Sequence, residues 1–152
     1  MLDIGTLAPD FTLPRDGGTD LSRADLIGRK VVLYFYPKDN TPGCTTEALD
    51  FTAMKAQFEA ANTVVIGISK DSVKKHDNFC KKHDLGIPLL SDENGTMCED
   101  YGVWQEKSMY GKTFMGIVRA TYLLDEAGKV LRIWPKVKVK GHAAEVLEAA
   151  QS

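Results

Sequence analysis

The sequence predicts an α/β fold in which a mixed central sheet carries helices on both faces. Short apolar runs rich in β-forming residues alternate with longer helical stretches, no linker or repeat interrupts them, and a hairpin signal follows late in the chain. The alternation favours parallel strands joined by right-handed crossovers, and the hairpin adds antiparallel strands. With 152 residues, the chain has the size of one domain, which we expect to span residues 1–152.

The first half of the chain predicts a strand pair, then strand, helix and strand. Residues 11–21 are expected to pair across a Gly-Gly turn, as an addition before the main alternation. Residues 31–36 (VVLYFY) and 63–69 form short, continuous apolar runs, which are typical of strands buried on both faces. Between them, residues 42–61 have an apolar stripe with helical spacing and predict one long helix.

The second half predicts a polar helix, a short strand, a short helix, a hairpin and a last helix. Residues 71–84 form the polar helix, residues 87–90 the strand and residues 93–101 the short helix. The hairpin spans residues 121–134, where two apolar runs flank the turn sequence DEAGK. The last helix is expected over residues 143–150, opened by Gly-His.

Composition narrows the classes of function. A net charge of −2 gives no attraction to nucleic acid or to an anionic membrane, and no such partner is expected. No apolar run approaches the roughly 20 residues of a membrane span, and the first residues lack the features of a signal peptide. Three cysteines are an odd, low number for a secreted disulfide scaffold, so we expect a cytoplasmic protein.

Residues 37–47, PKDNTPGCTTE, contain the candidate site. Thr41 suits the N-cap of the expected helix and Pro42 its first position, which makes Cys44 the third helical residue. There the sulfur would lie among unpaired amide groups at the positive end of the helix dipole, which favours the nucleophilic thiolate. Cys44 also begins the apolar stripe of this helix, so its side chain should point toward the protein.

A helix end alone activates a thiol only modestly. An unperturbed thiol is about 3% thiolate at pH 7, so complete deprotonation accelerates its reactions only about 30-fold. Arg119 is the candidate for a second activating group, because it directly precedes the expected strand 121–124. If that strand is antiparallel to residues 31–36, Arg119 lies at the same sheet edge as Cys44. Its guanidinium has five fixed donors, suited to holding a thiolate and an oxygen pair together.

The spacing Pro37-x-x-x-Thr41-x-x-Cys44 resembles the peroxiredoxins, and TPGCTTEA with Arg119-Ala-Thr-Tyr resembles their bacterioferritin comigratory protein, or peroxiredoxin Q, branch. The resemblance covers essentially the whole chain. It implies a thioredoxin-like fold with an N-terminal extension, and a peroxidase that reduces hydrogen peroxide and organic hydroperoxides without a cofactor. It also implies that Cys44 is the peroxidatic cysteine, that Thr41 and Arg119 activate it, and that Pro37 shields the thiolate.

Attack on a peroxide leaves a sulfenic acid, which a thiol must trap before it oxidises further. Many members of this branch carry a resolving cysteine five residues after the peroxidatic one, but that position here is Leu49. Some relatives place it in the helix that corresponds to residues 71–84, so the resemblance favours a disulfide between Cys44 and Cys80. Thioredoxin or glutaredoxin would then be the reductant, and the family expectation is a monomer.

The two remaining cysteines differ in their expected surroundings. Lys81 and Lys82 flank Cys80, which suggests access and a somewhat lowered pKa. Two carboxylates follow Cys98 and should disfavour its thiolate, and either cysteine could instead be a small half-buried hydrophobic residue. Cysteines on different helices rarely have Cα atoms within the ~7 Å that a disulfide requires. We therefore expect the first turn of the Cys44 helix, and part of the Cys80 helix, to unwind on oxidation.

Other functions stay open at this stage. A one-cysteine peroxidase would use an external thiol in place of Cys80, and a holdase or a redox-sensing partner would need no turnover. A thiol–disulfide oxidoreductase needs a C-x-x-C pair, but Thr41 stands where the first cysteine should be. One face of the expected helix carries His76, Cys80 and His83. These residues could be three ligands of a zinc site, although a fourth ligand is missing, or they could simply form a face of the helix that is exposed to solvent. No metal is expected.

Overall fold

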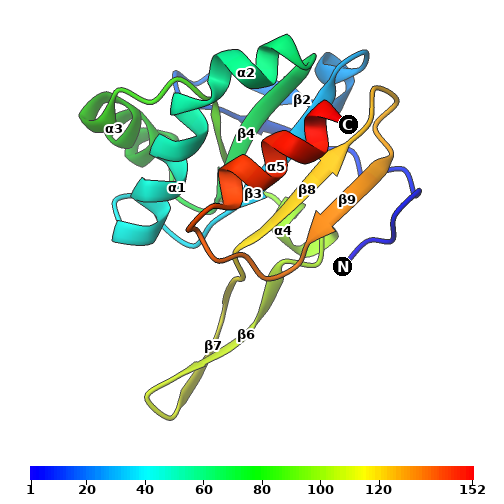
Figure 1. Ribbon diagram of the computed structural model, residues 1–152. Helices are drawn as coiled ribbons and strands as arrows, with labels where there is room; N and C mark the ends of the chain where they lie inside the picture. The colour runs from blue at the N-terminus through cyan, green and yellow to red at the C-terminus, as the bar shows by residue number, and fades with distance from the viewer.

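A five-stranded mixed sheet forms the centre of the computed structural model, which describes all 152 residues (Figure 1). The strand order is β5–β4–β3–β8–β9. The first three strands are parallel and the last two antiparallel, as the sequence predicts. These strands are β3 (Lys30–Phe35), β4 (Thr63–Ser69), β5 (Leu89–Ser91), β8 (Ala120–Leu124) and β9 (Val130–Trp134).

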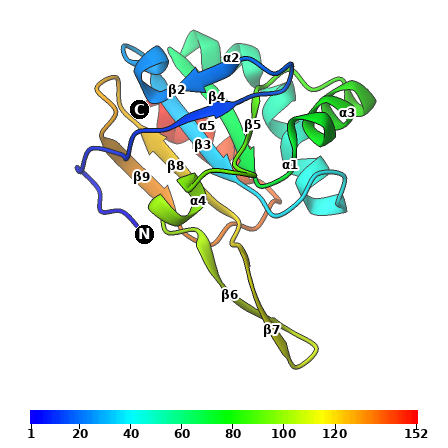
Figure 2. The same cartoon turned by 180° about the vertical axis from the view of Figure 1, so that it is seen from behind.

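Helices lie on both faces of the sheet, which confirms the predicted arrangement. One face carries α1, α2 and α5, with α3 beside α1 (Figure 1). The other face carries α4, together with the N-terminal strand pair β1–β2 and the 3₁₀ helix η1 (Figure 2). Their bounds are β1 (Thr12–Pro14), β2 (Asp20–Ser22), η1 (Arg23–Leu26), α1 (Pro42–Ala53), α2 (Lys55–Ala60), α3 (Val73–His83), α4 (Met97–Asp100) and α5 (His142–Gln151).

Strand β3 is buried on both faces because its side chains alternate between two apolar cores. Val32 and Tyr34 pack with α1, α3 and α5, whereas Leu33 and Phe35 pack with α4 and the N-terminal segment. This double burial explains why the sequence of the strand is an unbroken apolar run.

The register of β3 with β8 sets the position of the site. The two strands are antiparallel and Phe35 pairs with Ala120, so the end of β3 meets the start of β8. Arg119 directly precedes β8, and the loop after β3 leads into α1 at Pro42. The prediction that Arg119 shares a sheet edge with Cys44 is confirmed.

Two features differ from the sequence prediction. The helix expected over 42–61 is two helices, because Met54 leaves the helical backbone (φ −98°, ψ 4°), and neither proline nor glycine marks the break. A second hairpin, β6 (Trp104–Met109) with β7 (Lys112–Ile117), was not predicted. Most of its residues are exposed on both sides, so no apolar alternation marks it, and its turn is Tyr110-Gly111 rather than an Asn-Gly pair.

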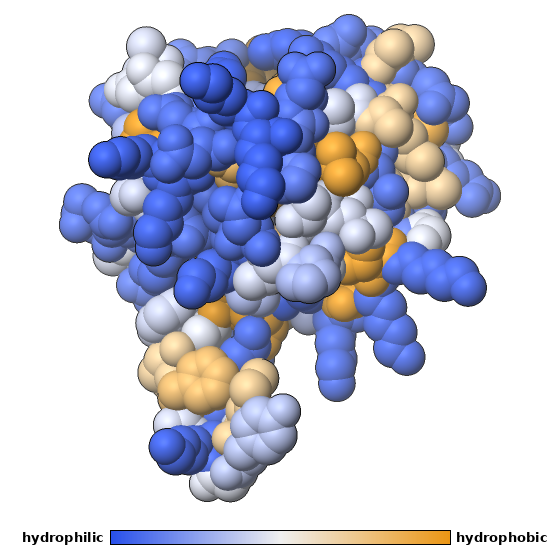
Figure 3. All heavy atoms as spheres, turned by 90° about the vertical axis from the view of Figure 1, so that its left-hand side faces the viewer, coloured by the Kyte–Doolittle hydropathy of each residue, from blue (hydrophilic) through white to orange (hydrophobic).

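The β6–β7 hairpin projects from the rest of the molecule (Figure 1), and several of its exposed side chains are apolar. Figure 3 shows them on the extension below a largely hydrophilic face. The exposed residues are Met109, Tyr110, Phe114 and Met115. None of the helices is both long and apolar enough to cross a membrane.

Candidate active site

Cys44 is the third residue of α1, preceded by Pro42 at the helix start and Thr41 at the N-cap. Its side chain is 1% exposed and belongs to the same apolar core as Ala48 and Phe51. The expectation that this cysteine begins the buried stripe of the helix and points toward the protein is confirmed.

Arg119 reaches the sulfur from the start of β8. Its Nη2 lies 3.3 Å from Sγ of Cys44 and donates to it, while its Nη1 donates to Oε1 of Glu47 over 2.7 Å. A Cβ atom at Gly43 would lie 3.2 Å from Nη2, so glycine at this position leaves room for the guanidinium. One arginine therefore bridges a thiol and a carboxylate that lie one turn apart on α1.

Sequence reasoning missed Glu47, although it is the carboxylate that orients Arg119. Its side chain is 1% exposed, and its Oε2 has no hydrogen-bond partner. Burial raises the pKa of Glu47 to about 7, and the neighbouring guanidinium of Arg119 offsets only part of that rise. Its role could have been inferred from its position three residues after Cys44, because that spacing places both side chains on the same buried side of the helix.

Thr41 and Pro37 occupy the loop between β3 and α1. Thr41 has the extended backbone of an N-cap residue, but its side chain does not cap the helix. Instead, its hydroxyl donates to the carbonyl of Lys38 over 2.8 Å, so the expected side-chain cap is absent. Pro37 is exposed at the start of this loop. The contact to the Cys44 sulfur comes from Arg119.

The predicted lowering of the Cys80 pKa is wrong. Cys80 is half-buried on α3, and burial together with the charges of Asp16 and Asp39 raises its pKa to about 12. The flanking lysines do not prevent this. Cys98 is fully buried and its pKa is raised as expected, but burial and the carboxylate of Asp92 are the main causes. All three cysteines are free thiols.

His76 does not share an exposed face with Cys80 and His83. Its ring is fully buried, and its two nitrogens lie 2.6 Å from Oδ2 of Asp39 and 2.9 Å from the Leu90 carbonyl. The His83 ring instead packs edge-on against Phe79. Neither the zinc site nor the solvated face considered for these three residues is present, because His76 points into the protein.

An open depression of about 680 Å³ adjoins Arg119. Lys107 of β6, Val118 and Val137 also line it, so the hairpin contributes one side of the approach to the guanidinium. Burial and the charge of Arg119 lower the pKa of Lys107. A second cavity of about 300 Å³ lies beside Thr63 at the opposite end of β4, and no cysteine lines it.

Known proteins resemble this chain along most of its length. The AhpC/TSA family matches residues 4–133. A putative peroxiredoxin bcp of Coxiella burnetii is 54% identical over 146 residues, covering 96% of this chain and 97% of the relative. A structure of the Xanthomonas campestris bacterioferritin comigratory protein, described for its alkyl peroxide reduction activity, superimposes with a TM-score of 0.89 at 47% identity, covering 93% of this chain and 90% of that one.

Two further structures of the Xanthomonas campestris protein, named there peroxiredoxin Q, are cysteine-to-serine mutants. They match with TM-scores of 0.87 and 0.88, each at 48% identity over 91% of this chain and 88% of that one. The two mutated cysteines lie 36 residues apart, which equals the separation of Cys44 and Cys80 in this chain.

Proposed function

Because the chain belongs to the AhpC/TSA family, in its bacterioferritin comigratory protein or peroxiredoxin Q branch, and is a cysteine-based peroxidase, we propose that Cys44 is its peroxidatic cysteine. The observation that carries this proposal is the 3.3 Å contact between Nη2 of Arg119 and the Cys44 sulfur. A fixed cation beside the sulfur stabilises a thiolate and the negative charge that spreads over both peroxide oxygens during attack.

The reaction transfers one oxygen atom to sulfur. The Cys44 thiolate forms an S–O bond, the O–O bond breaks, and the leaving oxygen takes a proton to become water or an alcohol. We propose hydrogen peroxide and organic hydroperoxides as substrates, and the alkyl peroxide reduction described for the Xanthomonas campestris relative supports the second class. Glu47 holds the guanidinium in place through Nη1, while Thr41 and Pro37 shape the loop before Cys44.

We propose Cys80 as the resolving cysteine. Its sulfur bonds to the Cys44 sulfur, the S–O bond breaks, and the oxygen leaves as water. The equal separation of the two mutated cysteines in the relative supports this pairing. In the reduced fold the pKa of Cys80 is about 12, so its attack requires α3 to open first and restore an ordinary thiol.

A thioredoxin or glutaredoxin would then reduce the disulfide, and we propose that the protein acts as a monomer. The three free thiols favour a reducing compartment such as the cytoplasm. An external thiol replaces Cys80 in the alternative one-cysteine cycle.

Peroxide turnover with thioredoxin tests the scheme in the wild type and in Cys44→Ser and Cys80→Ser. The first variant should lose all activity, and the second should lose only thioredoxin-dependent cycling. Mass spectrometry after one equivalent of peroxide should find linked Cys44 and Cys80 peptides. Persistent sulfenic acid with free Cys80 would establish the one-cysteine alternative, and an active Cys44→Ser variant would contradict the assignment of the nucleophile.

A further inference from the structure

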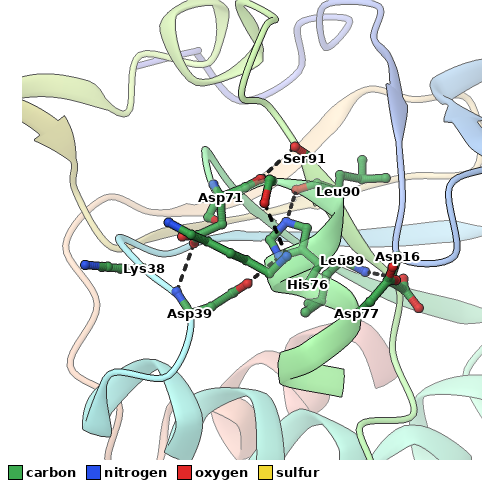
Figure 4. A network of polar contacts seen from close by, with 12 residues as sticks. Asp16, Lys38, Asp39, Asp71, His76, Asp77, Leu89, Leu90 and Ser91 are labelled. Atoms are coloured by element: carbon green, nitrogen blue, oxygen red, sulfur yellow. Dashed lines mark hydrogen bonds and ion pairs between the residues drawn. The ribbon is translucent and has the colours of Figure 1, made fainter. Parts of the chain in front are cut away.

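A buried polar network joins the loop before Cys44 to the helix that carries Cys80 (Figure 4). Asp39 lies in the β3–α1 loop, and its carboxylate accepts from the Tyr36 hydroxyl and contacts Nδ1 of His76, both over 2.6 Å. His76 lies in the first half of α3, and its Nε2 is 2.9 Å from the carbonyl of Leu90 in β5. The network therefore connects a loop, a helix and the edge strand of the five-stranded sheet.

A second carboxylate fixes the backbone of the same loop. Oδ2 of Asp71, between β4 and α3, accepts from the backbone N–H of Asp39 over 2.9 Å and from the hydroxyl of Ser69 over 2.7 Å. The Ser91 hydroxyl donates to the Asp71 carbonyl over 2.6 Å. The Asp39 end of the connection is thus held by two parallel strands of the central sheet.

The chemistry of these contacts defines an ion pair. A carbonyl oxygen only accepts, so Nε2 of His76 must carry a hydrogen, and Nδ1 faces a carboxylate. Burial lowers the pKa of His76, but the hydrogen bond and charge of Asp39, the Leu90 carbonyl and the charge of Asp71 raise it further than burial lowers it. The two side chains are 0% and 2% exposed. Removing either partner would leave a buried charge uncompensated, so this contact resists opening.

Each partner of the pair lies a few residues before one of the two sulfurs. Cys44 follows Asp39 by five residues, and Cys80 follows His76 by four. An extended chain spans at most ~3.3–3.6 Å per residue, so these segments reach about 17 and 14 Å from the pair. Beyond the pair, the Thr41 side chain leaves the start of α1 uncapped, and Cys80 of α3 is only half-buried.

We infer that the Asp39–His76 ion pair is a pivot that stays closed while the first turn of α1 and the second half of α3 unwind, and that it keeps Cys44 and Cys80 close enough to form their disulfide. The inference rests on the proposed two-cysteine cycle. Short tethers from one fixed point give the two sulfurs a high effective concentration. Asp39 and His76 are positioning residues in this scheme, because neither contacts the peroxide or the reacting sulfurs.

The test separates oxidation of Cys44 from its resolution. Reduced protein is mixed with peroxide and quenched with an alkylating reagent at successive times, and mass spectrometry follows free Cys44, sulfinic Cys44 and the Cys44–Cys80 linked peptides. In His76→Gln, Cys44 should oxidise within about threefold of the wild-type rate, whereas formation of the Cys44–Cys80 disulfide (linking) should slow about tenfold or more. Sulfinic acid should consequently accumulate at lower peroxide concentrations.

Two further variants make the result specific. Asp39→Asn preserves the hydrogen bonds, because an amide can donate to neutral His76 and accept from Tyr36, so this variant should fold and slow linking by a smaller factor. Asp77→Asn is the control: it weakens the hydrogen bond that the backbone N–H of Gly17 donates to Asp77 of α3, but it leaves the Asp39–His76 pair intact, so it should not slow formation of the disulfide.

Three results would overturn the pivot. If the Cys44–Cys80 disulfide forms at the wild-type rate in His76→Gln, the ion pair has no role in resolution. If it forms faster, the ion pair must break before the two sulfurs can meet. Equal slowing in Asp77→Asn would mean that any loosening of α3 has the same effect. If wild-type protein itself forms no linked peptides, the proposed two-cysteine cycle fails first, and that result is distinct from the other three.

Discussion

At the scale of single residues, Arg119 is the group on which the candidate site depends most. Two different nitrogens of one rigid guanidinium contact Cys44 and Glu47, and Gly43 provides the space for this approach. An ammonium group on a flexible stem cannot reproduce both contacts with fixed geometry. The planar fork of arginine is therefore the property that the site requires, beyond its positive charge.

Replacement of Arg119 by lysine should lower kcat/KM for peroxide by about 100-fold or more, because donors aimed at the developing charge lose their alignment. Stopped-flow measurement of Cys44 oxidation checks this directly. The control is Arg132→Lys, in which an exposed ion pair with Glu145 is altered and the rate should not change. A wild-type rate for Arg119→Lys would show that charge alone is sufficient.

Glu47 should make the stability of the fold depend on pH. Its pKa rises from 4.5 to about 7 on folding, so the folded protein binds a proton more tightly between these values. The resulting contribution to stability is complete below about pH 4.5 and is lost as pH rises through about 7, a change on the order of 3 kcal/mol.

Urea unfolding at pH 5 and pH 7 measures this contribution. In Glu47→Gln the position no longer titrates, so the free energy of unfolding should fall less between the two pH values than it does in the wild type. An identical fall in both proteins would mean that Glu47 titrates normally in the folded state.

The sequence could reveal those site residues that are marked by their neighbours in the chain. Cys44 stands in a short motif at a helix start, and Arg119 at the start of a strand whose pairing follows from the topology. Glu47 and the Asp39–His76 pair carry no such signal. Asp39 and His76 are 37 residues apart and meet only because β3, β5 and α3 come together, so helical spacing alone wrongly placed His76 on an outer face.

At the scale of elements, α3 combines a buried part, which extends from His76 to Phe79, with a weaker end. His76 and Phe79 are buried, but the helix ends at Asp84, a non-glycine residue in the left-handed region (φ 51°, ψ 51°). Such a backbone disfavours residues that have a Cβ. We therefore expect the end of the helix beyond Cys80 to open more readily than the part that contains His76.

Two substitutions at this end should change the rate of Cys44–Cys80 linking in opposite directions. Glycine at exposed Lys82 weakens the helix by about 1 kcal/mol and should accelerate linking up to about fivefold. Glycine at Asp84 relieves the left-handed backbone, stabilises α3 and should slow linking. The quenched time course measures both, and equal rates would show that opening of α3 does not limit resolution.

Elements were predictable where burial imposes a pattern on the sequence. The strands β3 and β4 are continuous apolar runs because both of their faces are covered. The β6–β7 hairpin lacks that constraint, since its backbone pairing depends on register and on the turn at Tyr110-Gly111. The break at Met54 is a backbone change that no residue preference marks.

At the scale of the whole molecule, the rigid and the movable parts are separate. Two apolar cores enclose the five-stranded sheet, and the end of β3 and the start of β8 hold the loop and the arginine of the site. Cys44 and Cys80 lie on α1 and α3, which are on the same side of the sheet (Figure 1). Local opening of these helix segments can therefore occur without loss of the sheet.

Hydrogen exchange should reveal this division when the oxidised and reduced proteins are compared. Amides in residues 42–47 and 77–84 should exchange faster after oxidation, because their helical hydrogen bonds open. Amides of β3, β4 and β8 should keep their protection, as should that of Asp39, which donates to Asp71. Oxidised Cys80→Ser provides the control, since it cannot form the disulfide and should retain the reduced pattern. Loss of protection throughout the sheet would mean that disulfide formation disrupts the whole domain, and the local mechanism would then be wrong.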